Sequence, residues 1–179
     1  VNVVVGYEYL FEPDWKELLL GTYENEYWRI TYYRTKPALT AVLQARHTNF
    51  GEILAASLTP LVRRGARRIF YAGPAAQVNP ALDSAQLVLP TEFASFSGRP
   101  TPFDNALKSG KERTLFVGLP SPLYATREWL TGARKNGVAA FDGEMARLAD
   151  EAARWAALPG LRVECAIAAT LGTFSSLHP

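Results

Sequence analysis

The chain has 179 residues, of which 48% are hydrophobic and 20% are charged, and its formal net charge is +2. This composition is typical of a globular domain with a sizeable core, and it excludes a disordered chain. The small charge argues against nucleic-acid binding, which usually needs a concentrated basic surface. No apolar run approaches the roughly 18 residues of a membrane helix. We expect one domain over residues 1–179 and no membrane contact.

Cys165 is the only cysteine, and it lies in an apolar run that is typical of a buried free thiol. Together with the absence of a signal-peptide pattern, this favours a reducing, cytoplasmic location. The His, Cys and carboxylate residues nowhere show the spacing of a metal site, and no phosphate-loop motif is present. We therefore expect no metal and no cofactor.

Strand-like and helix-like segments alternate from the start of the chain. A β-branched run predicts a strand over residues 2–5, and Pro13 favours a short helix over residues 13–20. The aromatic run 27–35 and the segment 38–44 predict a hairpin.

A helix is expected over residues 50–64, with Asn49 as its N-cap. Arginines at its end suit the helix dipole and a solvated surface turn. A strand over residues 68–72 follows, and it is expected to end in a turn at Gly73-Pro74-Ala75-Ala76.

The second half of the chain continues the alternation. Short strands are predicted over residues 86–89 and 114–117, with a long loop over residues 93–113 between them. A helix over residues 125–135 is expected to stop at Asn136-Gly137.

The most informative segment is GVAAFDGEMARLADEAARWAAL, residues 137–158. A buried strand over residues 138–141 stops at Asp142-Gly143-Glu144, and a helix begins at once. The apolar face of that helix is predicted to contain Met145, Leu148, Ala149, Ala152 and Ala156. A last apolar strand covers residues 161–170. We predict an α/β fold, a mixed sheet flanked by helices, with the two carboxylates at a strand end, where such sheets bind ligands.

Four segments resemble, in this order, the nucleoside phosphorylase family, which includes purine nucleoside and uridine phosphorylases and adenosylhomocysteine-type nucleosidases. They are ARRIFYAGPAAQV, SAQLVLP, GVAAFDGEMARLADEA and VECAIAATLGTFS. Thr48-Asn49-Phe50-Gly51 is a looser match to the Gly-rich turn of the family. The resemblance spans residues 38–175 and implies a nucleoside phosphorylase-like fold.

The resemblance also implies roles for single residues. Glu144 matches the family Glu that accepts hydrogen bonds from ribose hydroxyls, and Asp142 matches the acidic residue before it. Gly143 replaces a Met that packs on the sugar. Tyr124 lies near the aromatic residue that stacks on the base, and His47 lies near the Gly-rich turn, where it would exchange protons. The other interpretation is that Tyr124 is a core or surface tyrosine that needs no ligand and that His47 is a loop or core residue, as a lone His more often is.

The phosphate-contacting turn and the general acid depart from the family pattern. Gly73 begins the turn, but Pro74 replaces a Thr or Ser hydroxyl and Ala76 replaces a second Gly. Gly172 or Thr173 stands where the family has the Asp that protonates the leaving purine. Hydrolysis is therefore favoured over phosphorolysis, and no residue is assigned to activate the leaving group.

The leading hypothesis is binding of a nucleoside or nucleoside-like ligand with cleavage of its N-glycosidic bond. The alternative is a non-catalytic or repurposed protein of this fold that binds a ligand or a partner subunit. The aromatic segment 23–33 has two alternating faces, so part of it is expected to form a subunit interface in a homo-oligomer. The other interpretation is a hairpin that packs on the core of its own chain.

Overall fold

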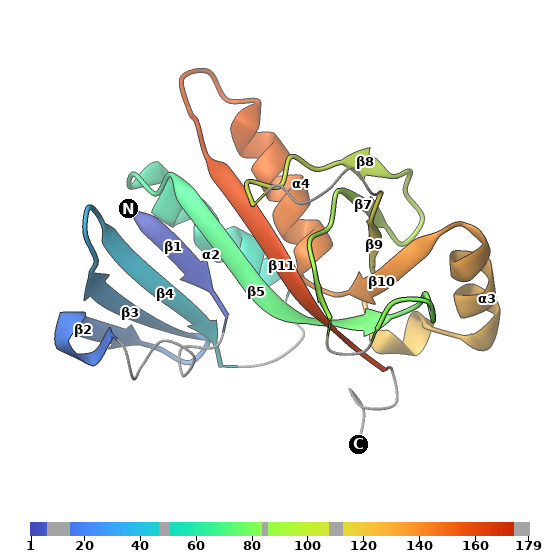
Figure 1. Ribbon diagram of the computed structural model, residues 1–179. Helices are drawn as coiled ribbons and strands as arrows, with labels where there is room; N and C mark the ends of the chain where they lie inside the picture. The colour runs from blue at the N-terminus through green and yellow to red at the C-terminus, as the bar shows by residue number, and fades with distance from the viewer. Residues whose placement is uncertain (7–14, 47–50, 84–85, 108–112, 174–179) are drawn as a thin grey trace.

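The computed structural model describes residues 1–6, 15–46, 51–83, 86–107 and 113–173, without the side chains of residues 51–53 and 55. The described residues form an 11-stranded mixed sheet flanked by three α-helices, as predicted. Figure 1 shows helices α2 and α4 behind the two longest strands and α3 at the far end beside β10. None of the helices described has the length and apolar character needed to span a lipid bilayer.

The strands are β1 (Asn2–Val5), β2 (Leu19–Glu24), β3 (Trp28–Arg34), β4 (Leu39–Ala45), β5 (Arg68–Gln77), β6 (Leu87–Val88), β7 (Glu92–Ser95), β8 (Thr101–Pro102), β9 (Leu115–Gly118), β10 (Val138–Asp142) and β11 (Glu164–Gly172). The helices are α2 (Gly51–Arg63), α3 (Arg127–Lys135) and α4 (Met145–Ala156), with 3-10 turns η2 (Lys16–Leu18) and η3 (Pro122–Tyr124). The strand order is β2-β3-β4-β1-β5-β10-β9-β7-β8, with β11 beside β5 and β6 beside β11.

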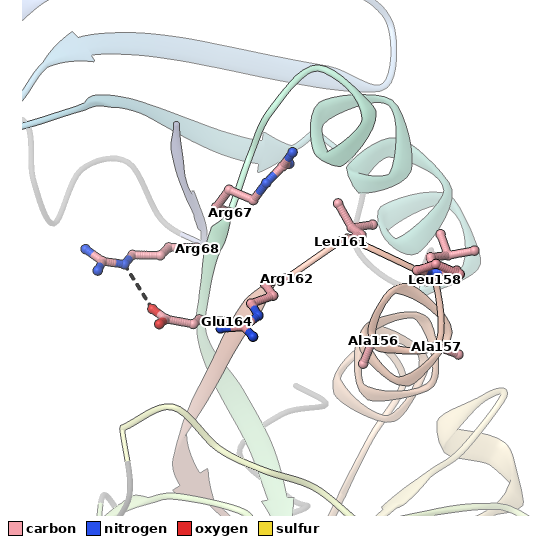
Figure 2. Close-up of a pocket in the computed structure, with 10 residues that line it drawn as sticks. Arg67, Arg68, Ala156, Ala157, Leu158, Leu161, Arg162 and Glu164 are labelled. Atoms are coloured by element: carbon pink, nitrogen blue, oxygen red, sulfur yellow. Dashed lines mark hydrogen bonds and ion pairs between the residues drawn. The ribbon is translucent and has the colours of Figure 1, made fainter.

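Strand β5 has a different neighbour on each flank. On one flank β11 runs parallel to it from the pair Glu164↔Arg68 onward, and the side chains of this pair form an ion pair of 2.9 Å (Figure 2). On the other flank β1 pairs with β5 only as far as Val5↔Tyr71, and β10 joins antiparallel at Phe141↔Ala76. Among the described residues, none forms a strand partner for residues 72–75 of β5 on that second flank.

This gap explains why the predicted turn at Gly73-Pro74-Ala75-Ala76 is wrong. The segment continues β5, with Gly73 and Pro74 paired to Ala169 and Thr170 of β11. Proline is excluded from the middle of a sheet because it cannot donate a ladder hydrogen bond. Position 74 lies between the end of β1 and the start of β10, and no strand in the described ranges would take a hydrogen bond from it on that flank.

Two other predicted segments differ from the structure. In the described part of 13–20, Trp15 is helical and Lys16–Leu18 form a 3-10 turn, but the helix does not reach residue 20, because β2 begins at Leu19 and pairs antiparallel with β3. The predicted loop 93–113 contains β8 and most of β7, because β7 pairs in parallel with β9 and buries Phe93. Asn49 lies outside the described residues.

The remaining predicted elements are confirmed, each within about three residues at its ends. The hairpin is the antiparallel pair β3 and β4, in register from Trp28↔Ala45 to Arg34↔Leu39. Gly137 follows α3 with φ at +72°, the left-handed conformation expected at a helix stop.

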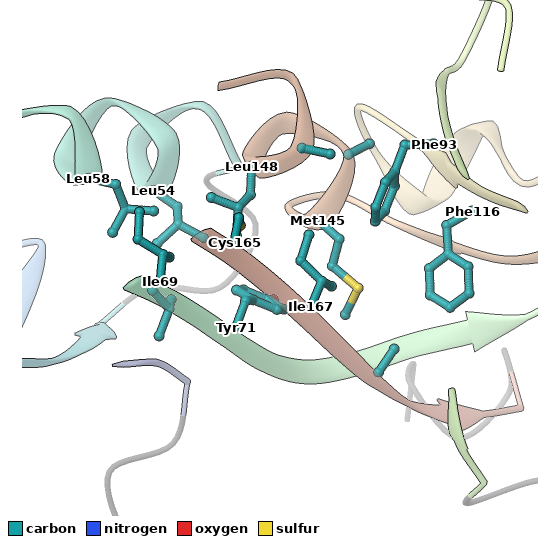
Figure 3. Packing of buried hydrophobic residues seen from close by; sticks show 14 of the residues in the cluster. Leu54, Leu58, Ile69, Tyr71, Phe93, Phe116, Met145, Leu148, Cys165 and Ile167 are labelled. Atoms are coloured by element: carbon teal, nitrogen blue, oxygen red, sulfur yellow. The ribbon is translucent and has the colours of Figure 1, made fainter. Parts of the chain in front are cut away.

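The main core lies between helices α2 and α4 and the strand pair β5 and β11 (Figure 3). Leu58, Leu148 and Ile167 contribute to it from three different elements, and each has a relative exposure of 0%. On α4, Trp155 rather than Ala156 completes the buried face. Trp155 lies two helical turns after Leu148, so both side chains point towards the sheet.

Candidate active site

A cavity of about 180 Å³ opens beside the unpaired stretch of β5. It is lined by Val5, Gly6, Leu43, Gln44, Ala45, Leu54, Tyr71, Ala72, Gly73, Pro74, Asp142, Gly143 and Glu144. The carboxyl ends of β1, β4 and β10 all reach it. Ligands of open α/β sheets bind at such ends, where neighbouring strands diverge.

Asp142 joins β10 to α4 by capping the helix. Its Oδ1 accepts hydrogen bonds from the backbone N–H groups of Glu144 at 2.6 Å and Met145 at 2.5 Å. Loss of hydration raises the pKa of Asp142 to about 6; the two backbone donors oppose this shift and the nearby charge of Glu144 adds to it. The capping contacts fix where Glu144 stands at the start of the helix.

The raised pKa of Asp142 predicts a specific pH dependence of stability. The folded-state pKa of about 6 exceeds the ordinary value of 3.8, so this group stabilises the fold fully below pH 3.8. That contribution, on the order of 2–3 kcal/mol, is lost as the pH rises through about 6. The free energy of unfolding should therefore fall as the pH rises towards 6, and Asp142→Asn is expected to remove this pH dependence.

Calorimetric unfolding of the wild type and Asp142→Asn across pH 4 to 7 checks this prediction. Asp150→Asn, an exposed change on the same helix, is the matched control and should keep the slope. Equal slopes in the wild type and Asp142→Asn would contradict the assignment to Asp142.

Glu144 is held by a tyrosine from the neighbouring strand. The Tyr71 hydroxyl donates a hydrogen bond of 2.7 Å to Glu144 Oε2, and Tyr71 is only 5% exposed. Gly73 makes room for this ring, because a Cβ at position 73 would lie 2.7 Å from the hydroxyl oxygen. Tyr71 was not among the residues predicted from the sequence, although it stands two residues before Gly73 on the same face of β5.

A second, larger depression of about 780 Å³ lies at the opposite end of β5 and β11 (Figure 2). Three arginines line it, and two have structural contacts: Arg67 donates to the carbonyls of Val62 and Ala66 near the end of α2, and Arg68 pairs with Glu164. These contacts agree with the prediction that the arginines complement the helix dipole and lie in a surface turn at the end of α2.

Several solved structures share the fold of this chain. A futalosine hydrolase mutant of Helicobacter pylori has a TM-score of 0.71 at 8% identity, over 96% of this chain and 86% of that chain. The S-adenosylhomocysteine nucleosidase of Streptococcus pyogenes, in complex with 5-methylthiotubericidin, has a TM-score of 0.69 at 14% identity, over 97% and 83%. A putative methylthioadenosine nucleosidase of Weissella paramesenteroides has a TM-score of 0.72 at 14% identity, over 96% and 87%.

The chain has the nucleosidase fold. The nucleoside phosphorylase-like fold that the resemblance implies is thus confirmed, and the low identity makes this chain a divergent representative of the fold. Neither a protein-family model nor a curated protein matches the sequence.

Within this nucleosidase fold, Gly73, Asp142, Gly143 and Glu144 come together at one cavity, although they were predicted from two distant segments. Tyr124 lies elsewhere: it is 50% exposed on η3 and packs against Phe96, with ring centroids 5.2 Å apart.

Of the other sequence-predicted positions, His47 lies outside the described residues. Gly172 and Thr173, at the end of β11, are not part of the described lining of the cavity. Within the part of the chain that the structure describes, no group of three or more His, Cys, Asp or Glu side chains is arranged to hold a metal ion.

Proposed function

We propose that the chain binds a nucleoside in the cavity beside β5 and hydrolyses its N-glycosidic bond. The observation that carries this proposal is the placement of Glu144, an anchored carboxylate in the cavity wall at the carboxyl end of β10. A carboxylate there accepts hydrogen bonds from sugar hydroxyls and stabilises the positive charge that develops on the sugar ring as the bond breaks.

Asp142 supplies a second carboxyl group to the same cavity. Its pKa of about 6 lies close to neutrality, which suits a group that gives or takes a proton during the reaction. Its Oδ1 is engaged by the start of α4, so Oδ2 is the oxygen we assign to that exchange.

The lining of the cavity favours water over phosphate as the attacking group. The described lining residues include two carboxyl groups and no Lys, Arg or His, so nothing there balances the charge of a phosphate ion. Pro74 also removes one backbone N–H from the segment that would face it.

The proposal is tested by incubating the protein with 5′-methylthioadenosine, S-adenosylhomocysteine, futalosine, adenosine and uridine and measuring the free base by chromatography. Base release that is independent of added phosphate supports hydrolysis, whereas phosphate-dependent release would replace it with phosphorolysis. If none of these nucleosides shifts the melting temperature and none releases its base, the result would favour the non-catalytic alternative.

We also propose that the chain self-associates through the edge strand β2. All six residues of β2 are exposed, and Leu19, Leu20 and Tyr23 are exposed by 49%, 49% and 57%. An unpaired strand edge with apolar side chains is suited to pairing with a second copy of the chain. The expected occupant of this edge is therefore the same strand of another protomer.

Replacing Leu20 by Asp is expected to convert the oligomer to a monomer, because a charge on the edge strand opposes pairing. Sedimentation velocity measures the mass of each species. Leu123→Asp, at a residue exposed by 89% on η3, is the control and should leave the mass unchanged. A wild type that sediments as a monomer would rule the interface out.

A further inference from the structure

The larger depression, at the end of β5 and β11 away from the candidate active site, has a basic side and an apolar side. Figure 2 shows Arg67, Arg68 and Arg162 beside the starts of the two strands, across from the end of α4. The lining on the side of the helix is Ala156, Ala157, Leu158, Pro159, Gly160 and Leu161. The Leu158 side chain is 53% exposed. The depression therefore offers a partner both cations and an apolar surface.

The three guanidinium groups keep N–H donors for a partner. Each guanidinium has five N–H groups. Arg67 donates from Nη1 to two backbone carbonyls near the end of α2, and Arg68 donates from Nε to Glu164. The side chains of the Arg68–Glu164 pair are 68% and 65% exposed, and a pair that exposed contributes little to stability, so another carboxylate can compete for Arg68. Arg162 is exposed and makes no hydrogen bond or ion pair with a described residue.

Positive charge is concentrated at this end of the molecule. Residues 63–68 contain four arginines and no acidic residue, and Arg63 and Arg64 are exposed at the end of α2. Within the described lining of the depression, Glu164 is the only acidic residue. The formal net charge of the whole chain is only +2, so the cluster does not reflect a generally basic surface. The local charge is complementary to an acidic partner.

The chemistry of the lining favours an acidic protein segment over a nucleic acid. The planar guanidinium group matches a carboxylate in a bidentate pair. No aromatic side chain on which a base could stack is among the described lining residues, and the Glu164 carboxylate would repel a phosphate backbone. We propose that the depression is a docking site for an extended acidic segment of a partner protein, with carboxylates on Arg68 and Arg162 and an apolar side chain against Leu158.

The experiment measures binding of labelled peptides by fluorescence anisotropy. A peptide of Glu-Glu-Leu repeats is expected to bind at least about tenfold more tightly than one of Lys-Lys-Leu repeats, and its affinity should fall as the salt concentration rises. Arg162→Ala should weaken binding of the acidic peptide by about tenfold, the effect of one charge-assisted hydrogen bond. Arg99→Ala is the matched control, because Arg99 is an exposed arginine between β7 and β8, outside the described lining, and it should keep the wild-type affinity.

The apolar side of the depression is tested separately. Leu158→Ser should weaken binding of the Glu-Glu-Leu peptide, but it should not change binding of a peptide of Glu-Glu-Ser repeats, which has no apolar side chain to bury. An equal effect on both peptides would remove Leu158 from the docking site. Melting curves show whether each variant folds.

Three results would overturn the docking site. They are equal affinity for the acidic and basic peptides, an equal loss in Arg162→Ala and Arg99→Ala, and tighter binding of a single-stranded oligouridylate than of the acidic peptide. The last result would indicate a nucleic-acid surface instead. If Arg162→Ala does not fold, the charge preference and salt dependence of the wild type decide. The candidate active site lies at the other end of the strands, so none of these results depends on nucleoside hydrolysis.

Discussion

Replacing Glu144 by Gln is expected to lower kcat/KM for nucleoside hydrolysis by about 10²–10³-fold, the usual cost of removing one group that stabilises transition-state charge. The amide keeps the size of the side chain and an oxygen that still accepts from Tyr71. It lacks the negative charge that opposes the positive charge on the sugar ring. The expected loss is therefore catalytic, with little change in the melting temperature.

The measurement is the rate of base release at several substrate concentrations, alongside a melting curve for each variant. Glu128→Gln is the matched control, because Glu128 lies in the first turn of α3, away from the cavity. We expect Glu128→Gln to retain wild-type rates. Activity of Glu144→Gln within about threefold of the wild type would remove Glu144 from the mechanism.

Replacing Leu148 by Ala is expected to lower the free energy of unfolding by about 2–5 kcal/mol, the range for a leucine truncated in a close-packed core. Leu148 is 0% exposed and packs in the main core, where α4 lies against the sheet. The loss is large because helix and sheet cannot close the resulting cavity without moving α4. Glu144 lies at the start of this helix, so a shift would reach the candidate active site.

Urea denaturation of the wild type and the variant measures the difference. Leu123→Ala supplies a control with the same change in side chain, because Leu123 is 89% exposed; a difference of no more than about 0.5 kcal/mol is expected there. A cost below about 1 kcal/mol for Leu148→Ala would mean that α4 does not pack on the sheet as described.

The parts of the fold that depend on local patterns could be predicted from the sequence. The junction of β10 and α4 changes from an apolar run to helical spacing within three residues, which made its boundaries clear. The continuation of β5 through Gly73 and Pro74 could not be predicted in the same way. It depends on where β1 ends, on where β10 begins and on the whole length of β11, all of which are distant in sequence.

The candidate site was likewise predictable in part. The grouping of Gly73 with Asp142 and Glu144 followed from the family resemblance, and the cavity contains all three. Tyr71 was missed because its partner, Glu144, is 73 positions away and no motif marks the residue. In a strand, residues two apart lie on the same face, so Tyr71 and Gly73 could have been grouped. The prediction of a turn at residue 73 prevented this, because it ended the strand before Gly73.

The break in strand pairing beside β5 has a consequence for how the molecule unfolds. Five segments that are far apart along the chain, around residues 5, 44, 54, 73 and 143, line the cavity at that break. A small molecule seated there touches all of them and acts as a non-covalent cross-link between the β1 and β10 sides of the sheet. Because it binds only the folded chain, it raises the free energy of unfolding by mass action, by about 2.7 kcal/mol at one hundred times its Kd. Resistance to unfolding thus reports occupancy even for a compound that the protein never cleaves.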